Sequence, residues 1–397
     1  MSVSRASGMR AVLAFRPPPA LSAPPVSRHR CRVRAACDDR RVDHAFGKRA
    51  GFPIGVEEEL LLVEPHSLGL AQRASQLLER LPEQAHPDVY ESLLETASDV
   101  RGRAEGAVTD LLELRAAMRH AGATLMGAGV HPTARFGDVH HVPQPRYDTI
   151  HAALRGLLER TPTCALHVHV GMPDAETAID AANRMRSHLP LLQALTANSP
   201  YWHGRDSGFA TARAQLFRGY PRAVVPRAFA GWDDYAETVE RWRAAADVAD
   251  YTFLWWDLRP HPRLGTIEVR AMDAQARSHA VLGIAALVHS LAVASAAGEG
   301  MIESAEAITE SSFRAGRDGL EAKLWWHERL RPAREVADET LALARSYARD
   351  LGEDAALIEI DRILAEGNGA DRMRAAHQRG GMRAVLERLV AETAERR

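Results

Sequence analysis

The stretch ALHVHV, residues 165–170, decides the predicted fold because polar and aliphatic side chains alternate along it. Successive side chains of a β-strand point to opposite faces, so His167 and His169 share one face and the aliphatic residues share the other. Strands with one polar face are typical of antiparallel sheets, whereas the strands of a fully covered parallel sheet are apolar throughout. We therefore expect an α+β protein with a mostly antiparallel sheet whose polar face carries the function.

The rest of the chain alternates between strand-like and helix-like periods. Strands are expected at 54–63, 124–129, 164–171, 253–259 and 266–272, and helices at 104–122, 175–197, 232–248, 280–297 and 335–351. The final stretch, 353–397, is predicted to be helical with a break at Gly380 and Gly381. Polar residues interrupt the longest apolar run, 280–297, which indicates a buried core helix rather than a membrane span.

The charges of the 397-residue chain nearly cancel, with 50 Lys and Arg against 52 Asp and Glu and a formal net charge of −2. This balance argues against the basic surface that a nucleic-acid-binding or membrane-surface protein needs. Only Lys48 and Lys323 are lysines, so phosphate handling must fall to arginine, metal and backbone. Cys31, Cys37 and Cys164 are too few and too scattered for a disulfide framework, and we expect a cytoplasmic protein.

Residues 1–48 differ in composition from everything that follows. Seven arginines precede the first acidic residue, Asp38, and prolines interrupt any helix. The segment lacks the uninterrupted apolar stretch of a secretory signal, and an organelle transit peptide stays an alternative. We predict a disordered extension over 1–48 and a single catalytic domain over 49–397.

Two further strands repeat the placement of ionisable groups two residues apart. GVEEEL at 55–60 puts Glu57 and Glu59 on one face, and TIEVR at 266–270 does the same for Glu268 and Arg270. Each pair taken alone could be a solvated face or a surface salt bridge. A sheet face with several carboxylates repels itself unless cations neutralise it, however, and Mg²⁺ or Mn²⁺ with oxygen ligands are the natural partners.

A fourth acidic element follows the first strand. A helical reading of DVYESLLE, residues 88–95, places Asp88 and Glu95 on one stripe, and an ordinary amphipathic helix is the alternative. Neither a Walker-type phosphate loop nor a dinucleotide-binding glycine motif is present in the sequence.

Eight short motifs, in order, carry a resemblance to a known family. They are GVEEEL at 55–60, LET at 94–96, GVHP at 129–132, HVHVG at 167–171, NSPYW at 198–202, GRDSGFA at 204–210, WWDLRP at 255–260 and TIEVRAMD at 266–273. Over about 52–390 the chain resembles the YbdK-type carboxylate–amine ligases, also called type 2 glutamate–cysteine ligases. The resemblance implies a glutamine-synthetase-like fold, in which an antiparallel sheet forms an active-site funnel with helices outside.

The resemblance also implies roles for individual residues. It nominates as metal ligands Glu57, Glu59, Asp88, Glu95, His167 and Glu268, with His169 as a ligand or as the residue that orients one. Arg270 would stabilise the phosphate in transfer, with Glu268 beside it at the catalytic centre. Arg205, Arg213 and Arg259 are candidates for contacts with the nucleotide or with a substrate carboxylate.

The reaction that the resemblance implies is amide formation with ATP and Mg²⁺. A carboxylate, plausibly the γ-carboxylate of glutamate, attacks the γ-phosphate of ATP, and an amine, plausibly cysteine, displaces phosphate from the acyl phosphate. Small-molecule amino acids and ATP are the expected partners, and a homodimer is compatible with this reading. Trp202, Trp255 and Trp256 are candidates to exclude water from the site, with core packing as the alternative.

Some features of the sequence stay open. The family usually has a Pro-x-x-Gly-x-Pro turn where residues 221–226 read PRAVVP, and the lost glycine removes easy access to positive φ. His140 and His141 lie in a proline-rich loop where a solvated role and a substrate-facing role cannot be told apart. Two other functions remain: a metal-dependent hydrolase built on His167 and His169, and a non-catalytic nucleotide-binding protein.

Overall fold

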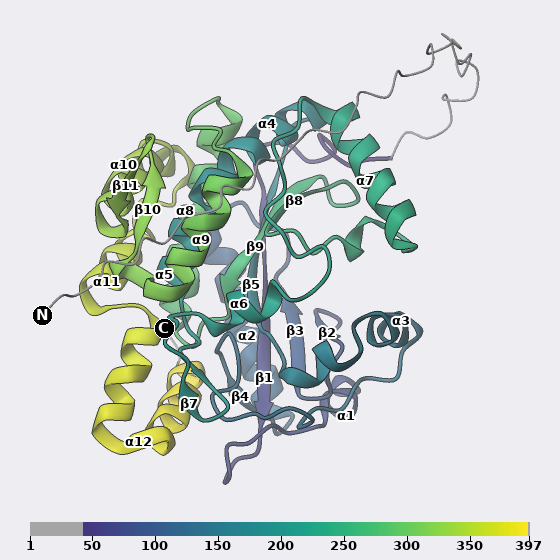
Figure 1. The fold of residues 1–397 in the computed structure, drawn as a ribbon, viewed down its shortest axis with the longest axis vertical. Helices are drawn as coiled ribbons and strands as arrows, with labels where there is room; N and C mark the ends of the chain where they lie inside the picture. Colours follow the sequence, from purple (N-terminus) through teal and green to yellow (C-terminus); the bar gives the residue numbers. More distant parts are fainter. Residues whose placement is uncertain (1–42, 396–397) are drawn as a thin grey trace, which may run out of the picture. The chain divides into compact units, whose positions relative to one another are not determined.

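A central sheet organises the residues that the computed structural model describes, which are 43–395 (Figure 1). The strand order is β2-β3-β1-β5-β9-β8, with β4 also paired to β1, and each of these pairings is antiparallel. The strands are β1 Ile54–Val63, β2 Ala85–Pro87, β3 Leu93–Ala97, β4 Thr124–Met126, β5 Ala165–Gly171, β8 Leu258–His261 and β9 Thr266–Asp273. The prediction of a mostly antiparallel α+β fold is confirmed.

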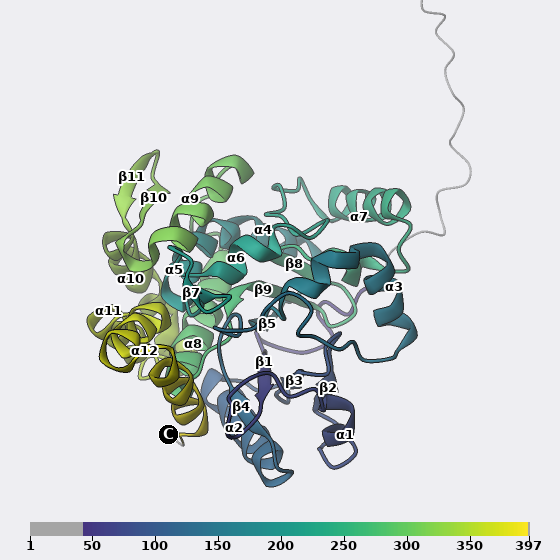
Figure 2. The same ribbon diagram turned by 60° about the horizontal axis from the view of Figure 1, so that its bottom comes forward.

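Helices surround this sheet. They are α1 Ala74–Leu78, α2 Ala104–His120, α3 Pro145–Leu154, α4 Ala175–Met185, α5 Leu189–Thr196, α6 Ala212–Phe217, α7 Trp232–Ala246, α8 Ser278–Ala296, α9 Ala305–Asp318, α10 Ala333–Leu351, α11 Ile358–Glu366 and α12 Gly369–Ala394. Two small hairpins lie outside the sheet: β6 Tyr201–Trp202 with β7 Arg205–Asp206, and β10 Lys323–Trp326 with β11 Arg329–Pro332. Figure 2 shows α3 at one side of the sheet and α12 at the other.

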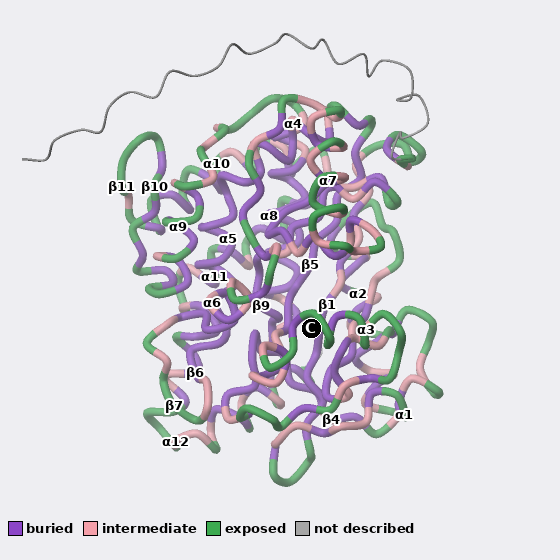
Figure 3. The backbone as a smooth tube through the Cα atoms, turned by 45° about the vertical axis from the view of Figure 1, so that its right-hand side comes forward, coloured by how far each residue is buried: buried purple, intermediate pink, exposed green. Residues whose placement is uncertain are grey.

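The apolar face of the sheet packs on helices to form the main core. Val168 of β5 and Ile267 of β9 are fully buried in one cluster with residues of α2, α4 and α8. Helix α8 is long and apolar enough to cross a membrane, but 83% of its most apolar window is buried inside the protein (Figure 3). Gly283 of α8 lies so close to α11 that an added Cβ would come within 2.7 Å of Glu359 Cβ. Helix α8 is therefore a core helix, as the sequence predicts.

A buried ion pair joins the sheet to this helical layer. Glu58, between the two acidic residues of the polar face, points to the opposite side of β1. Its carboxylate accepts two hydrogen bonds from Arg115 of α2, at 2.8 and 2.6 Å, and both side chains are 1% exposed. Arg115 also donates to the carbonyl oxygens of Gln275 and Ala276, which follow β9. One guanidinium therefore fixes α2 against two separate parts of the sheet.

Residues 88–95 are the clearest departure from the sequence prediction. Instead of a helix, the structure has a turn followed by β3, which pairs with β1 so that Glu95 lies opposite Glu59. The carboxylate of Glu91 accepts hydrogen bonds from the backbone and hydroxyl of Ser75 at 2.9 and 2.6 Å, which holds the turn against α1. Backbone pairing with β1 therefore overrides the helical spacing of the acidic residues.

Two other predicted elements have different bounds. The strand expected at 253–259 begins only at Leu258, because the Asp250 side chain accepts the Thr252 N–H and starts a 3₁₀ turn at 251–253. The single helix expected at 175–197 is divided into α4 and α5 by a 3₁₀ turn at 186–188, with Pro190 in the first turn of α5. The break predicted at Gly380 and Gly381 is confirmed, since both have non-helical backbone angles inside α12.

The loop without the family's glycine still contains a left-handed residue. Arg222 has a φ of 68°, and its side chain donates to the Phe253 carbonyl oxygen at 2.9 Å and lies over the Trp255 ring. Val224, which stands where the family has its glycine, is not among the residues with positive φ, so the left-handed conformation of this turn lies at Arg222 instead.

The predicted N-terminal extension lies mostly outside the described residues. The described part begins at Asp43, within the predicted extension. Phe46 is buried, and its ring centroid lies 5.6 Å from that of Trp232 in α7. The Ala45 and Gly47 N–H groups donate to the carbonyl oxygens of Pro262 and Met172. Residues 45–47 are thus part of the folded domain.

Candidate active site

A polar cavity of about 310 Å³ opens on the face of the sheet opposite the main core. Ten of the residues nominated from the sequence line it: Glu57, Glu59, Asp88, Glu95, His167, His169, Arg213, Arg259, Glu268 and Arg270. They come from β1, β3, β5, β8, β9, α6 and the turn after β2. The antiparallel register therefore gathers groups that are as far as 213 positions apart in the chain.

The register aligns the first acidic strand with the histidine strand. Glu57 and His167 are direct partners of β1 and β5, and His169 is the partner of Gly55. The Glu57 carboxylate lies 3.3 Å from His167 Nδ1 and 3.4 Å from His169 Nε2. Burial alone would raise the pKa of Glu57, but the charge of His169 and hydrogen bonds with both imidazoles hold it well below its ordinary value. Glu57 is thus an ionised carboxylate.

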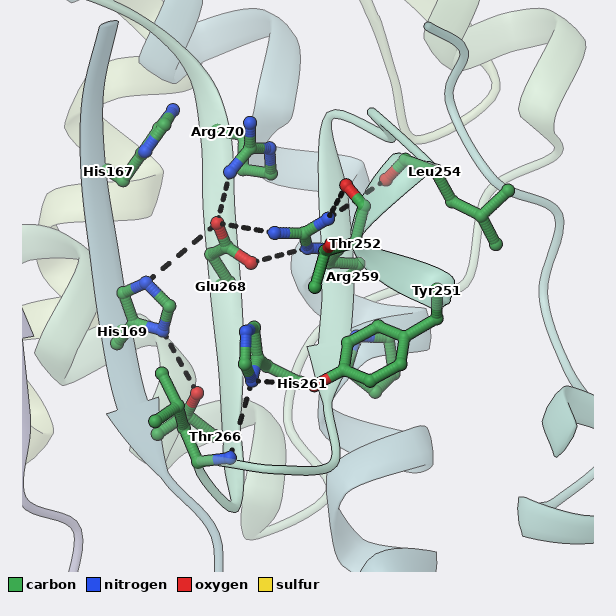
Figure 4. Close-up of polar contacts among 12 residues, drawn as sticks. His167, His169, Tyr251, Thr252, Leu254, Arg259, His261, Thr266, Glu268 and Arg270 are labelled. Atoms are coloured by element: carbon green, nitrogen blue, oxygen red, sulfur yellow. Dashed lines mark hydrogen bonds and ion pairs between the residues drawn. The ribbon is translucent and has the colours of Figure 1, made fainter. Parts of the chain in front are cut away.

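Glu268 occupies the other side of His169 and is held by two arginines (Figure 4). Arg259 Nε donates to Glu268 Oε2 at 2.5 Å, and Arg270 NH1 donates to Oε1 of the same carboxylate. The burial of Glu268 would raise its pKa, but these guanidinium charges lower it well below the ordinary value. Glu57, His169 and Glu268 offer ligand atoms that all lie within 4.8 Å of one another.

Three further carboxylates lie together at the other end of the row. Glu59 and Glu95 are direct partners of β1 and β3, and Asp88 lies in the turn before β3. Burial raises the pKa of Glu59 to about 8, with the charge of Asp88 adding to the effect. Burial and then the charges of Glu57 and Glu59 raise the pKa of Glu95 well above its ordinary value. The positive charge near these three carboxyl groups is therefore too small to keep all of them ionised.

The donor set fits a divalent cation. Carboxylate oxygens are the ligands that Mg²⁺ and Mn²⁺ prefer, and several buried carboxylates in one cavity need a cation to ionise together. His167 Nε2 is also buried and makes no hydrogen bond within residues 43–395. Burial, followed by the charge of Arg270, lowers the pKa of His167 to about 4, so its imidazole is neutral and free to bind a metal.

The nominated arginines divide into those inside and those outside the cavity. Arg213 of α6 is 3% exposed, donates to the Arg270 carbonyl oxygen at 3.3 Å, and has an Nε without a hydrogen bond in the described part of the chain. Arg259 is committed to Glu268 and to the carbonyl oxygens of Thr252 and Leu254. Arg205 is exposed on β7 and lines neither this cavity nor the one described below. The structure therefore does not bring Arg205 to the site.

Several cavity residues were missed or left undecided by the sequence prediction. Tyr90, Tyr220, Arg146 and His261 line the cavity without having been nominated. Only His261 had an available signal, because it lies two residues after Arg259 and so shares its face of β8. The others belong to α3 and to loops, where no strand period applies.

The aromatic candidates lie in different parts of the structure. Trp255 lines the cavity, and so does Tyr147, whose hydroxyl donates to the Pro87 carbonyl oxygen at 2.6 Å. Trp256 instead packs against Phe229 in a core cluster, and Trp202 packs beside Val130. Of the three tryptophans, only Trp255 is placed to exclude water from the cavity.

A second cavity of about 470 Å³ meets the first at Glu57 and His169, which line both. Its walls are largely apolar and include Ile54, Met172 and Leu264, together with the basic residues Lys48 and Arg49. The row of carboxylates and histidines can therefore be reached from two sides, one strongly polar and the other mainly apolar.

Comparison with known sequences gives a consistent result. Glutamate–cysteine ligase family 2 (GCS2) matches residues 53–390. A Rubrobacter xylanophilus protein provisionally named glutamate–cysteine ligase 2-3 is 36% identical over 88% of this chain and 99% of its own length. A Gloeobacter violaceus protein provisionally named glutamate–cysteine ligase 2 is 34% identical over 81% of this chain and 91% of its own.

Solved structures share the fold at low sequence identity. The glutamate–cysteine ligase of Francisella tularensis in complex with AMP has a TM-score of 0.67 and 14% identity, and the match covers 89% of this chain and 91% of that one. A bifunctional glutathione synthetase of Pasteurella multocida has a TM-score of 0.63 and 14% identity, with 86% of this chain and 52% of that chain covered.

Proposed function

This chain belongs to glutamate–cysteine ligase family 2 and is an ATP-dependent ligase, and we propose that it joins the γ-carboxylate of glutamate to an amine, with cysteine as the first candidate. The observation that carries the proposal is the row of carboxylates and histidines that ends at the Glu268–Arg270 pair. Such a row suits the transfer of a phosphoryl group held by cations and by an arginine.

The chemistry proceeds in two balanced steps. The carboxylate oxygen of the first substrate forms a bond to the γ-phosphorus of ATP, the bond from that phosphorus to the bridging oxygen breaks, and ADP leaves. The amine nitrogen then attacks the acyl carbon, inorganic phosphate leaves with its electron pair, and the nitrogen loses a proton to give the amide. Bound Mg²⁺ would neutralise phosphate charge and align the groups. Glu57, Glu59, Glu95, His167 and Glu268 would hold it, with Asp88 and His169 beside them.

Arg270 is placed to stabilise the phosphoryl group during transfer. Its NH1 is fixed by Glu268, which orients the guanidinium, while its Nε is buried and has no hydrogen-bond partner within residues 43–395. Arg213, which donates to the Arg270 carbonyl oxygen, offers a second such Nε and suits a substrate carboxylate. Because an acyl phosphate is lost to hydrolysis, exclusion of water by Tyr147 and Trp255 favours the amine as the attacking group.

The two cavities suggest where the substrates enter. The charged cavity, with Arg146 and Arg213, matches amino acid substrates, and the apolar second cavity matches the nucleoside of ATP. Val100 lines the second cavity and is half exposed, so Val100→Trp would narrow it without filling the core. We expect this variant to raise KM for ATP and to leave KM for glutamate unchanged.

The test measures phosphate release and product together. The purified chain is incubated with ATP, Mg²⁺, glutamate and one amine at a time, and amide formation is followed by mass spectrometry. With glutamate labelled by ¹⁸O in its γ-carboxylate, one labelled oxygen is expected in the released phosphate. Activity is expected to stop on metal chelation and to return with Mg²⁺ or Mn²⁺.

A matched pair of arginine variants tests the placement of the site. Arg270→Ala should abolish phosphate release, whereas Arg205→Ala, outside both cavities, should retain it. The absence of amine-dependent ADP formation over the whole substrate panel would reject the ligase assignment. Hydrolysis of a substrate without ATP would instead favour a metal-dependent hydrolase at the same histidines.

A further inference from the structure

A second cluster of potential metal ligands lies outside both cavities. It consists of His141 in the loop before α3, His151 on α3 and Glu159 in the 3₁₀ segment 155–160 that follows α3. Each contributes one ligand atom, and the three atoms lie within 4.8 Å of one another. None of the three lines the polar cavity or its apolar neighbour.

The spacing of these atoms approaches that of a tetrahedral site. Glu159 Oε1 lies 3.4 Å from His151 Nε2 and 3.8 Å from His141 Nε2. Two ligands bound at about 2.0–2.2 Å to a tetrahedral Zn²⁺ are separated by roughly 3.4 Å. The two imidazole centroids lie 4.4 Å apart, so both rings face the same small volume. Shifts of side chains alone would therefore bring the three atoms to ligand distances.

His141 supplies a separate sign that a partner is missing. Its Nε2 is buried and makes no hydrogen bond within residues 43–395, although it faces Glu159. The backbone of this residue is fixed by a β-bridge with Tyr90, and the next residue, Val142, donates its N–H to the Val89 carbonyl oxygen at 3.0 Å. The imidazole is thus held toward Glu159 and His151 by a rigid backbone.

From this geometry we propose that His141, His151 and Glu159 form a metal site for a borderline divalent cation of the Zn²⁺ class, separate from the carboxylate-rich active site. Two imidazoles and one carboxylate select Zn²⁺ over Mg²⁺, which prefers oxygen ligands alone. With three protein ligands, the fourth tetrahedral position is left to water.

The proposed metal site lies behind one wall of the polar cavity. His151 and Glu159 belong to α3 and to the 3₁₀ segment, both of which contribute residues to the wall of the polar cavity, and His141 lies in the loop that leads into α3. Arg146, Tyr147 and Ile150 lie between His141 and His151 and all line that cavity. A bound cation would therefore fasten this wall in place, which couples the availability of Zn²⁺ to the shape of the cavity.

The test is calorimetric titration of the full chain with Zn²⁺ in the presence of excess Mg²⁺, which competes with Zn²⁺ at the carboxylate-rich site. We expect the chain to bind one equivalent of Zn²⁺. His151→Ala and Glu159→Gln should each lower the Zn²⁺ affinity by more than about 10–100-fold, which is the loss typical for a residue outside the ligand shell. Both residues lie near the surface, and circular dichroism verifies that the variants fold.

His140→Ala is the matched control, because this exposed histidine is adjacent to His141 but is not part of the cluster. It should bind Zn²⁺ like the unaltered chain, and so should Glu57→Gln, which changes only the active site. The proposal is overturned if no Zn²⁺ binds in excess Mg²⁺. It is equally overturned if His151→Ala and Glu159→Gln bind as tightly as the unaltered chain, or if Glu57→Gln removes the equivalent.

Discussion

Glu58 and Glu59 are neighbours on β1 with different roles, since Glu58 stabilises the fold and Glu59 belongs to the candidate active site. Replacing each of them by glutamine separates the two roles. Glu58 is 1% exposed and accepts two hydrogen bonds from Arg115, which has the same exposure. Glu59 points into the polar cavity, where its Oε2 accepts the Ala165 N–H at 2.6 Å. The two substitutions replace a carboxyl group by an amide at adjacent positions on different faces of one strand.

The expected cost of Glu58→Gln follows from the state in which it leaves Arg115. The guanidinium stays buried, because it also donates to the Gln275 and Ala276 carbonyl oxygens, but it loses the only carboxylate that the structure shows bonded to it. Removing one partner of a buried ion pair costs about 3–5 kcal/mol. Because the glutamine side chain keeps one oxygen that can accept a hydrogen bond from Arg115, we expect a cost of about 3 kcal/mol, at the lower end of this range. Glu59→Gln should change the free energy of unfolding by less than about 0.5 kcal/mol, because a pKa of about 8 leaves that carboxyl mostly neutral at pH 7.

Urea denaturation at pH 7 without metal measures both values. Glu58→Gln should lower the denaturation midpoint at an unchanged m value. Its ligase activity in Mg²⁺, expressed per folded molecule, should stay close to that of the unaltered chain. Glu59→Gln should keep the midpoint and lose Mg²⁺-dependent activity. Equal losses of stability in the two variants, or a loss below about 1 kcal/mol for Glu58→Gln, would refute the assignment of Arg115 as a buried, otherwise uncompensated cation.

Three further predictions concern other parts of the chain. Arg270→Lys should lower phosphate release by about 100-fold or more in a folded protein, because an ammonium cannot bind Glu268 and present a second donor in the same plane. Burial lowers the pKa of His188 from 6.5 to about 4. Between these two values the unfolded chain binds a proton that the folded chain does not, so the stability present above pH 6.5 is lost as the pH falls through 4. Urea titrations of His188→Leu should lack this loss, which amounts to up to about 3 kcal/mol. Asp247 ends α7 at a φ of 51°, and thermal unfolding of Asp247→Gly should show a stabilisation of about 0.5–1 kcal/mol.

The sheet was predictable because alternation is a local property of the sequence. The bounds expected for the first strand are those of β1, and the pairs 57/59, 167/169 and 268/270 share the cavity face, as a period of two requires. The strand expected at 253–259 was wrong because side-chain hydrogen bonds hold its first residues in a turn. Asp250 accepts the Thr252 N–H, and Arg259 donates to the Thr252 and Leu254 carbonyl oxygens. The alternation of polar and apolar residues does not report such side-chain contacts.

The acidic segment at 88–95 shows why a site can be predicted more securely than the structure that presents it. Its carboxylates reach the cavity, yet by a turn and a strand instead of a helix. Spacing of three or four residues suggested a helix, but the backbone hydrogen bonds available from β1 decide the conformation. The resemblance to the family correctly associated Asp88 and Glu95 with the first strand, because it depends on residue order and not on local conformation.

The arginines of the cavity are shared unevenly among its carboxylates. Arg259 and Arg270 are both bonded to Glu268, so Arg213 is the remaining nominated arginine near four other carboxylates, and it lies 3.9 Å from Asp273. Burial raises the pKa of Glu59 to about 8 and the pKa of Glu95 well above its ordinary value, and the charges of neighbouring carboxylates add to both shifts. Arg146 also lines the cavity, so four arginines in all contribute positive charge to it. As proposed above, a divalent cation bound with the nucleotide would supply further positive charge beside Glu59 and Glu95 and would lower the pKa of both carboxyls.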